Sequence, residues 1–279
     1  MLNNSASRAE LFSAPLGQDQ RVDDVLRRID RFCDEVPRHW AMASDDGPLR
    51  LFVRNRSGSG WPFYARPIPG GPQVTAEDIE RVRARQRGLR VPEAFEWVAD
   101  TTPSMADAAR DAGLPVTICP LLVLNSDPIA PSLPPGYSAR LLGPADGDLQ
   151  AAAHAVLTVA AAAFKAPPPG PPVGAALAEL QADLAAGAIA RALVTGPGGP
   201  VAAGSVQRVG DVVELVGIGT VAAARGQGLG AAVTALLAAA ARNAGAEVVF
   251  LAAGDEAATR VYERVGFRRV GECGMAEAT

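Results

Sequence analysis

The sequence predicts a mixed α/β protein built in two halves. Short runs rich in β-branched residues alternate with longer stretches of helical periodicity, many of them rich in alanine. A proline-rich segment, NSDPIAPSLPPGYSA at 125–139, separates two regions that each show this alternation. We therefore expect one α/β domain at 1–130 and a second at 131–279.

The N-terminal half predicts two helices and a hairpin. Helical patterns cover 23–32 and 75–87, and Thr75 with Asp78 resembles a capping box at the start of the second. The segment 49–67 predicts a hairpin that turns at the Ser-Gly-Ser-Gly sequence. Its last part, GWPFYARP, is the densest aromatic patch of the chain. This patch either walls a substrate pocket or packs between the halves.

The C-terminal half shows a more regular series of elements. In chain order we expect a strand at YSARLL, a helix capped by Asp146 or Asp148, and a second helix near 173–187. Three strands follow, AIARALVTG, VAAGSVQRVG and DVVELVGIGTV, separated by glycine-containing turns. After a glycine loop come a helix to about Ala244, the strand AEVVFLAA, the helix ATRVYERV and the strand FRRVGEC.

An internal similarity links the two halves. The segments 96–119 and 249–273 share one plan: a strand, a polar turn, a helix ending in Ala-Gly-Leu or Val-Gly-Phe, and a strand ending in cysteine. Such units also recur by chance, so a duplicated fold and a coincidence both remain open at this point.

Composition excludes several functional classes. The net charge of −4 argues against a nonspecific nucleic-acid binder, which needs a positive field. Cys33, Cys119 and Cys273 are widely spaced and form no Cys-x-x-Cys pair, which argues against a zinc site or a disulfide framework and for a reducing cytoplasm. The first residues show no basic segment followed by a continuous apolar core, so we expect no signal peptide, and the longest apolar runs fall short of the ~20 residues that a bilayer requires. We expect no metal and no membrane.

The sequence ARGQGLGAA at 224–232 is the strongest chemical signal of the chain. A simple strand-to-helix turn is one interpretation. However, three clustered glycines lose conformational entropy on folding, and a simple turn does not require them. A helix N-terminus with free N–H groups is a natural anion site. A dinucleotide-binding loop is the other alternative. Against it, Glu247 lies at the start of the next strand, and too few residues follow to complete such a domain.

Two motifs together resemble the GNAT superfamily of N-acetyltransferases. Arg225-x-x-Gly228-x-Gly230 is similar to that family's pyrophosphate-binding loop, and the segment from Ala258 through Tyr262 to Gly266 and Phe267 is similar to its A-x-x-x-Y-x-x-x-G-F motif. The resemblance covers about 136–279 and implies a GNAT fold, a central twisted mixed sheet flanked by helices. No such loop occurs before residue 130, so the N-terminal half resembles a degenerate GNAT-like copy in tandem.

The resemblance implies a site for acetyl-CoA. The pyrophosphate would bind the loop, and the pantetheine arm would run along the end of the preceding strand, where one amide would polarise the thioester carbonyl. It also places Asp255 beside the cofactor, where the family often has asparagine. The implied cofactor-binding residues are Ile218, Gly219, Thr220, Arg225, Gly226, Gln227, Gly228, Leu229, Gly230, Ala231 and Asp255.

Two residues are candidates for catalysis. Tyr262 matches the tyrosine that the family uses as general acid for the CoA thiolate, and the alternative is a packed core tyrosine. Glu214 lies eleven residues before Arg225, where some members keep a glutamate as general base. Strand alternation predicts that Glu214, Val216, Ile218 and Thr220 share one face, so the carboxyl would have apolar neighbours and a raised pKa. A solvent-facing glutamate is the alternative.

The resulting hypothesis is an N-acetyltransferase that moves an acetyl group from acetyl-CoA to the primary amine of a small molecule. The rivals are a noncatalytic acyl-CoA sensor and a protein acetyltransferase. The acceptor cannot be read from the sequence, and a homodimer remains open.

Overall fold

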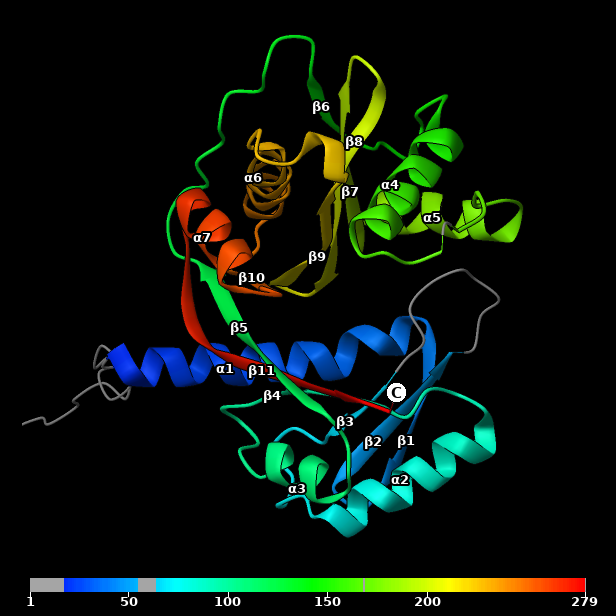
Figure 1. The fold of residues 1–279 in the computed structure, drawn as a ribbon, viewed down its shortest axis with the longest axis vertical. Helices are drawn as coiled ribbons and strands as arrows, with labels where there is room; N and C mark the ends of the chain where they lie inside the picture. The colour runs from blue at the N-terminus through cyan, green and yellow to red at the C-terminus, as the bar shows by residue number, and fades with distance from the viewer. Residues whose placement is uncertain (1–17, 55–63, 168, 279) are drawn as a thin grey trace, which may run out of the picture.

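The computed structural model describes residues 18–54, 64–167 and 169–278. In this part of the chain all strands join one eleven-stranded sheet, in the order β1-β2-β3-β4-β11-β5-β10-β9-β8-β7-β6 (Figure 1). The strands are β1 (Ala41–Asp46), β2 (Leu49–Arg54), β3 (Ala65–Pro67), β4 (Ala94–Val98), β5 (Val116–Leu124), β6 (Ser138–Leu141), β7 (Ile189–Gly196), β8 (Gly199–Val209), β9 (Val212–Thr220), β10 (Val248–Ala252) and β11 (Phe267–Glu277). The helices are α1 (Gln18–Glu35), η2 (Val36–His39), α2 (Ala76–Leu89), α3 (Met105–Asp111), α4 (Leu149–Ala163), α5 (Ala175–Ala185), η3 (Ala222–Ala224), α6 (Leu229–Asn243) and α7 (Glu256–Val265).

The N-terminal half follows its predicted pattern, with strand β1 and the short helix η2 as additions. Helix α2 begins with the predicted capping box, in which the Thr75 side chain accepts from the Asp78 amide and the Asp78 carboxylate accepts from the Thr75 amide. Strands β2 and β3 pair antiparallel as the hairpin requires, while its predicted turn at 57–60 lies outside the described residues. Strand β1 was not predicted, because its sequence AMASDD has little β-propensity; pairing with β2 holds it in the sheet.

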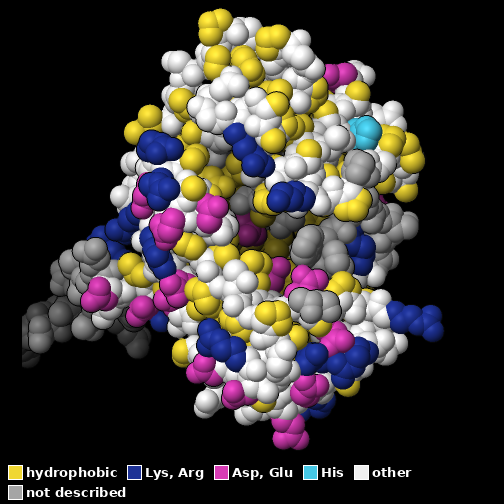
Figure 2. Space-filling view, in the orientation of Figure 1, with side chains coloured by type: hydrophobic (Ala, Val, Ile, Leu, Met, Phe, Trp, Pro, Cys, Tyr) yellow, Lys and Arg dark blue, Asp and Glu magenta, His cyan; other side chains and the backbone are white. Residues whose placement is uncertain are grey.

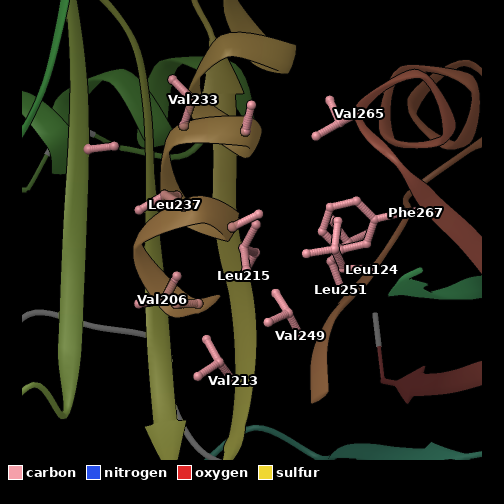
Figure 3. Close-up of a cluster of buried hydrophobic side chains, with 14 of the residues drawn as sticks. Leu124, Val206, Val213, Leu215, Val233, Leu237, Val249, Leu251, Val265 and Phe267 are labelled. Atoms are coloured by element: carbon pink, nitrogen blue, oxygen red, sulfur yellow. The ribbon is translucent and has the colours of Figure 1, made fainter. Parts of the chain in front are cut away.

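The C-terminal half contains every helix and strand that the sequence predicts. Strands β6 to β9 form an antiparallel meander, and β10 then pairs in parallel with β9 after the crossover through α6. Helix α6 packs its apolar side on this sheet, as the buried cluster in Figure 3 shows. Helix α7 ends at Gly266, which takes the left-handed conformation (φ +116°) that a glycine cap favours.

The two halves exchange strands at the centre of the sheet. Strand β5, from the N-terminal half, lies between β10 and β11, and β11 in turn lies between β5 and β4. The antiparallel β5–β11 pair, which crosses the middle of Figure 1, puts Cys119 directly opposite Cys273. These cysteines end the two similar sequence segments, and each segment forms a strand, a helix and a strand: β4-α3-β5 and β10-α7-β11.

Gly274 is needed where this exchange brings β11 against β4. It stands opposite Trp97, and a Cβ on Gly274 would overlap the indole ring. We expect Gly274→Ala to reduce the free energy of unfolding by about 1–3 kcal/mol, because overpacking forces side chains off their rotamers. Urea denaturation measures the effect. Gly88→Ala is the control, since no atom lies near its added Cβ in helix α2, and it should leave stability unchanged or slightly higher.

Candidate functional site

Strands β9 and β10 are paired only at their beginnings. The last pair in register is Phe250 with Glu214, and beyond it the strands separate. The strands form a wedge there, and a cavity of about 700 Å³ lies between the end of β9 and helices α4, α6 and α7. Eleven of the thirteen site residues expected from the sequence line it: Ile218, Gly219, Thr220, Arg225, Gly226, Gly228, Leu229, Gly230, Ala231, Asp255 and Tyr262. Gln227, exposed in the loop, and Glu214, at the vertex of the wedge, are not among its lining residues.

The glycine loop presents the N-terminus of α6 to the cavity. Gly226 (φ +79°) and the N-cap residue Gly228 (φ +77°) have left-handed backbone conformations that strongly favour glycine. The N–H groups of the first turn of a helix have no partner within the helix, and the helix dipole makes this end positive. No acidic residue occupies the first turn of α6. The arrangement therefore favours a bound anion such as a pyrophosphate.

Arg225 is one of the residues that line the cavity. Its Nε donates to the Thr220 carbonyl at 3.2 Å, and its Nη2 donates to the Ala163 carbonyl at 3.4 Å. These bonds tie the loop to the end of β9 and to the last turn of α4, while the side chain stays exposed. The guanidinium is thus positioned beside the loop and remains accessible to a phosphate.

A β-bulge corrects the expected alternation along β9. Ser205 pairs with Val216, but Ala203 pairs with Gly219, so β9 has one extra residue between these pairs. The extra residue reverses the alternation. Glu214 and Val216 lie on one face, whereas Ile218 lies on the other and packs into the α6 core cluster. The expectation that Glu214 and Ile218 share a face was therefore wrong, since one inserted residue moves all later side chains to the opposite face.

The two glycines of this bulge have structural reasons for their identity. Gly217 takes a left-handed conformation (φ +62°). A Cβ on Gly219 would lie 2.5 Å from the Cβ of Ala163, so glycine allows α4 to approach β9. Close packing of α4 and the bulge therefore account for both glycines.

Tyr262 and Asp255 lie on the α7 side of the cavity. Burial, with a smaller effect of the Asp255 charge, raises the pKa of Tyr262 to about 12. The phenol is therefore protonated at neutral pH and can donate a hydrogen bond. The Asp255 carboxylate accepts from the Ala258 amide at 2.7 Å as the N-cap of α7, so the acid at this position has a structural role in addition to lining the cavity.

Glu214 lies at the vertex with no hydrogen-bond donor among the described residues. Burial raises the pKa of its carboxyl to about 8, and repulsion from Glu96 adds to the shift while Arg66 opposes it. A carboxyl with a pKa near neutrality is suited to accept a proton from an amine. The raised pKa agrees with the prediction, although its neighbours are charged groups of the N-terminal half and not only apolar side chains.

These neighbours are the functional candidates that sequence reasoning did not identify. Glu96, Tyr64 and Arg66 all belong to the N-terminal half and interact electrostatically with Glu214 or with one another. The available signal was the aromatic patch GWPFYARP, which contains Tyr64 and Arg66.

The N-terminal half repeats the topology of the site but not its chemistry. Strand β3 leads through α2 to the parallel strand β4, as β9 leads through α6 to β10. The first turn of α2, however, carries Glu77 and Asp78, and the capping box satisfies the amides of Thr75 and Asp78. Negative side chains at this helix end disfavour a second anion.

Within the described ranges, no three or more His, Cys, Asp or Glu side chains gather as a metal site. None of the described helices combines the length and apolarity needed to cross a bilayer.

Comparisons with known proteins agree with this geometry. Residues 161–267 match the model of the acetyltransferase (GNAT) family, and none of the curated protein sequences compared with the chain matches it. A GCN5-related N-acetyltransferase from Kribbella flavida is similar in structure, with a TM-score of 0.69, 24% identity, and coverage of 91% of this chain and 96% of that one. A GCN5-related N-acetyltransferase from Sphaerobacter thermophilus has a TM-score of 0.60 at 16% identity, covering 92% and 90%. A tandem GNAT protein from the clavulanic acid biosynthesis pathway has a TM-score of 0.50 at 16% identity, covering 83% and 78%.

Proposed function

We propose that this protein is an N-acetyltransferase, since residues 161–267 match the model of the acetyltransferase (GNAT) family, whose members transfer acyl groups from acyl-CoA. Its acyl donor is acetyl-CoA and its acceptor is the primary amine of a small molecule. The observation that carries the proposal is the cavity itself, which joins the N-terminus of α6 to the Tyr262 side chain. One end suits a pyrophosphate and the other a leaving thiolate.

The reaction is a direct transfer. The amine nitrogen attacks the thioester carbonyl carbon, forming the C–N bond, and the C–S bond breaks as the tetrahedral intermediate collapses. Glu214 accepts the proton that the amine loses, and the Tyr262 hydroxyl donates a proton to the departing thiolate. Backbone N–H groups on the free edge of β9, beyond its last pair with β10, would stabilise the oxyanion.

The N-terminal half is, in this proposal, a GNAT-like copy that no longer binds the donor. The acidic first turn of α2 supports this view. We also propose a cytoplasmic location, which fits three unpaired thiols. The boundary near residue 130 falls between β5 and β6, so the two domains proposed at 1–130 and 131–279 would be interlocked through the exchanged strands.

Binding of acetyl-CoA tests the first step. At a concentration of about 100 Kd, a ligand that binds only the native state adds about 2.7 kcal/mol, which corresponds to a rise in Tm on the order of 5 °C for a chain of this size. We expect Gly228→Asp to abolish this rise, because it places a carboxylate at the anion-binding end of α6. Differential scanning fluorimetry with millimolar acetyl-CoA measures it.

Gly245→Asp is the matched control. Gly245 also has positive φ (+83°), follows the other end of the same helix, and has open space around an added Cβ. Both variants lower Tm, but only Gly228→Asp should lose the acetyl-CoA response. If the wild type shows no rise, the proposed function is wrong. If acetyl-CoA binds but no amine in a panel is acetylated, the noncatalytic sensor is favoured, and acetylation of lysine peptides alone would favour the protein acetyltransferase.

A further inference from the structure

A second cavity lies at the parallel strand pair of the N-terminal half. Strands β3 and β4 pair only through Ala65 and Phe95. Helix α1 and the residues that follow these two strands line a cavity of about 580 Å³, which we call the α1 cavity. Its lining residues outside α1 are Pro69, Gly70, Asp100 and Thr101. Ligands of open α/β sheets commonly bind in a crevice outside the carboxyl ends of parallel strands, so the position of this cavity suits a ligand.

Helix α1 contributes two arginines to the α1 cavity, Arg27 and Arg31, which are one turn apart. Arg31 Nε donates to the Arg27 carbonyl at 3.3 Å, and neither guanidinium forms an ion pair with any residue in the described ranges. Arg28, which lies between them in the sequence, instead pairs with Asp211 at 2.8 Å and with Glu247 at 2.9 Å. Like charges at this spacing destabilise a helix. The two arginines that line the cavity therefore lack a counter-charge.

Most other arginines of the N-terminal half have a carboxylate partner. Arg81 pairs with Asp46 at 2.6 Å, and Arg83 pairs with Glu93 at 2.7 Å. In the lower part of Figure 2, where the N-terminal half lies, most basic side chains are accordingly seen beside acidic ones. The unpaired arginines of the α1 cavity differ from this pattern, and an anionic group of a ligand would supply the missing partner.

The α1 cavity also contains carboxylates that are free to bind a cation. Asp100 is held in place, because its Oδ2 accepts a hydrogen bond from the Glu272 amide at 2.8 Å. A Cβ on Gly271 would overlap this oxygen, so the glycine leaves room for the carboxylate. Asp23 adds a second carboxylate, and within the described part of the chain neither aspartate forms an ion pair. The third lining carboxylate, Asp30, is buried and already has an ion pair with β3.

We propose that the α1 cavity binds a small zwitterion, a molecule with one carboxylate and one ammonium group. Arg27 and Arg31 pair with its carboxylate, and Asp23 and Asp100 pair with its ammonium group. The two carboxylates of the cavity repel a polyanion such as a nucleotide, and the two arginines repel a polyamine. The α1 cavity shares no lining residue with the donor cavity, so its ligand is independent of the proposed transferase function.

Calorimetric titration of the full chain with three zwitterions tests the proposal. Leucine, β-alanine and 6-aminohexanoate differ in the distance between their charged groups, and the amide and the N-acetyl derivative of each probe remove one charge at a time. We expect at least one zwitterion to bind, and both of its derivatives to bind about tenfold more weakly or worse, because each loses a charge-assisted hydrogen bond. Replacing both Arg27 and Arg31 with glutamine should weaken binding of the zwitterion but not of its amide. Asp100→Asn keeps an oxygen for the Glu272 amide and should weaken binding of the zwitterion but not of its N-acetyl derivative.

Arg21→Gln is the matched control, since Arg21 is an exposed arginine of α1 that does not line the cavity. This variant should bind the zwitterion as wild type does. The proposal is overturned if none of the three zwitterions binds at millimolar concentration, or if the double arginine variant keeps the full affinity. Equal binding of acetate and the zwitterion would also overturn it, because the ammonium group would then contribute nothing. The rise in Tm with acetyl-CoA, measured on the same samples, reports the donor cavity separately.

Discussion

Replacing Glu214 with glutamine is expected to lower kcat/KM for the amine by about 10²- to 10³-fold, in the range typical of losing a general base. Glutamine keeps the size of the side chain but cannot accept the proton that the attacking amine must lose. Binding of acetyl-CoA should be unchanged, because Glu214 does not line the donor cavity. Steady-state kinetics measures the loss of acyl transfer, and the rise in Tm with acetyl-CoA measures donor binding separately.

The pH dependence of kcat/KM gives a second measure of the role of Glu214. Burial first, and Glu96 second, raise the pKa of Glu214 to about 8, so the base ionises only as pH rises through this value. We expect kcat/KM of wild type to increase between pH 7 and 9 and this limb to disappear in Glu214→Gln. Arg66, Cys33 and Cys273 also interact electrostatically with Glu214, and burial keeps the pKa of both thiols well above its ordinary value.

The raised pKa of Glu214 also determines how the stability of the folded protein changes with pH. The folded-state pKa of Glu214 lies above its unfolded value of about 4.3, so the protonated carboxyl is favoured in the folded protein. Stability from this group is complete below the unfolded pKa and is lost as pH rises through about 8. Glu214→Gln should therefore become more stable relative to wild type above pH 8. Glu263→Gln, at an exposed position on α7, is the control. An unchanged kcat/KM in Glu214→Gln would show that another group or a water accepts the proton.

The largest loss of stability is expected for Asp30→Asn. Asp30 is 5% exposed and Arg66 is 1% exposed, and the two form a buried ion pair that joins α1 to β3. Removing one partner leaves the buried guanidinium without its counter-charge, which typically costs about 3–5 kcal/mol. Urea denaturation should show a corresponding fall in the free energy of unfolding, and marginal folding at 37 °C.

Replacing both partners of the ion pair with apolar residues separates the effect of charge on stability from the effect of packing. Asp30→Leu combined with Arg66→Met removes both charges together, and such replacements are often neutral or stabilising. We expect the double variant to recover most of the stability lost in Asp30→Asn. Equal instability of the double and single variants would contradict this account and point to the shape of the site. Because Arg66 opposes the shift of Glu214, the double variant should also raise the pKa seen in the rate profile.

The sequence predicted the C-terminal half well because its signals are local. Gly226 and Gly228 require backbone conformations that few other residues adopt, and the apolar α6 follows directly, so the loop and helix could be located from the printed residues alone. Tyr262 was placed by the spacing of its motif. These features depend on neighbours in the chain, and they line one cavity in the structure.

Features that depend on pairing between distant strands were missed. The bulge in β9 is set by its register with β8, and alternation alone cannot show where one residue is inserted. Strand β1 forms only through its pairing with β2. The electrostatic interaction of Glu96 with Glu214 was hidden from the sequence, because β4 reaches the region of Glu214 only through the exchange of β11 and β5 between the halves. Contacts across more than a hundred residues leave no periodic signal.

The exchange of β5 and β11 has a consequence for how the chain is made. Among the described strands, β11 is synthesised last, yet it occupies the centre of the sheet next to β4 and β5. Strands β4 and β5 are therefore synthesised before their shared neighbour β11 exists. The sheet can form completely only after β11 has left the ribosome. Contacts of such high sequence separation slow folding and prolong the exposure of unpaired edges. The protein should accordingly depend on chaperones during synthesis more than a single GNAT domain does, and a pulse-labelled nascent chain that ends before β11 should remain protease-sensitive.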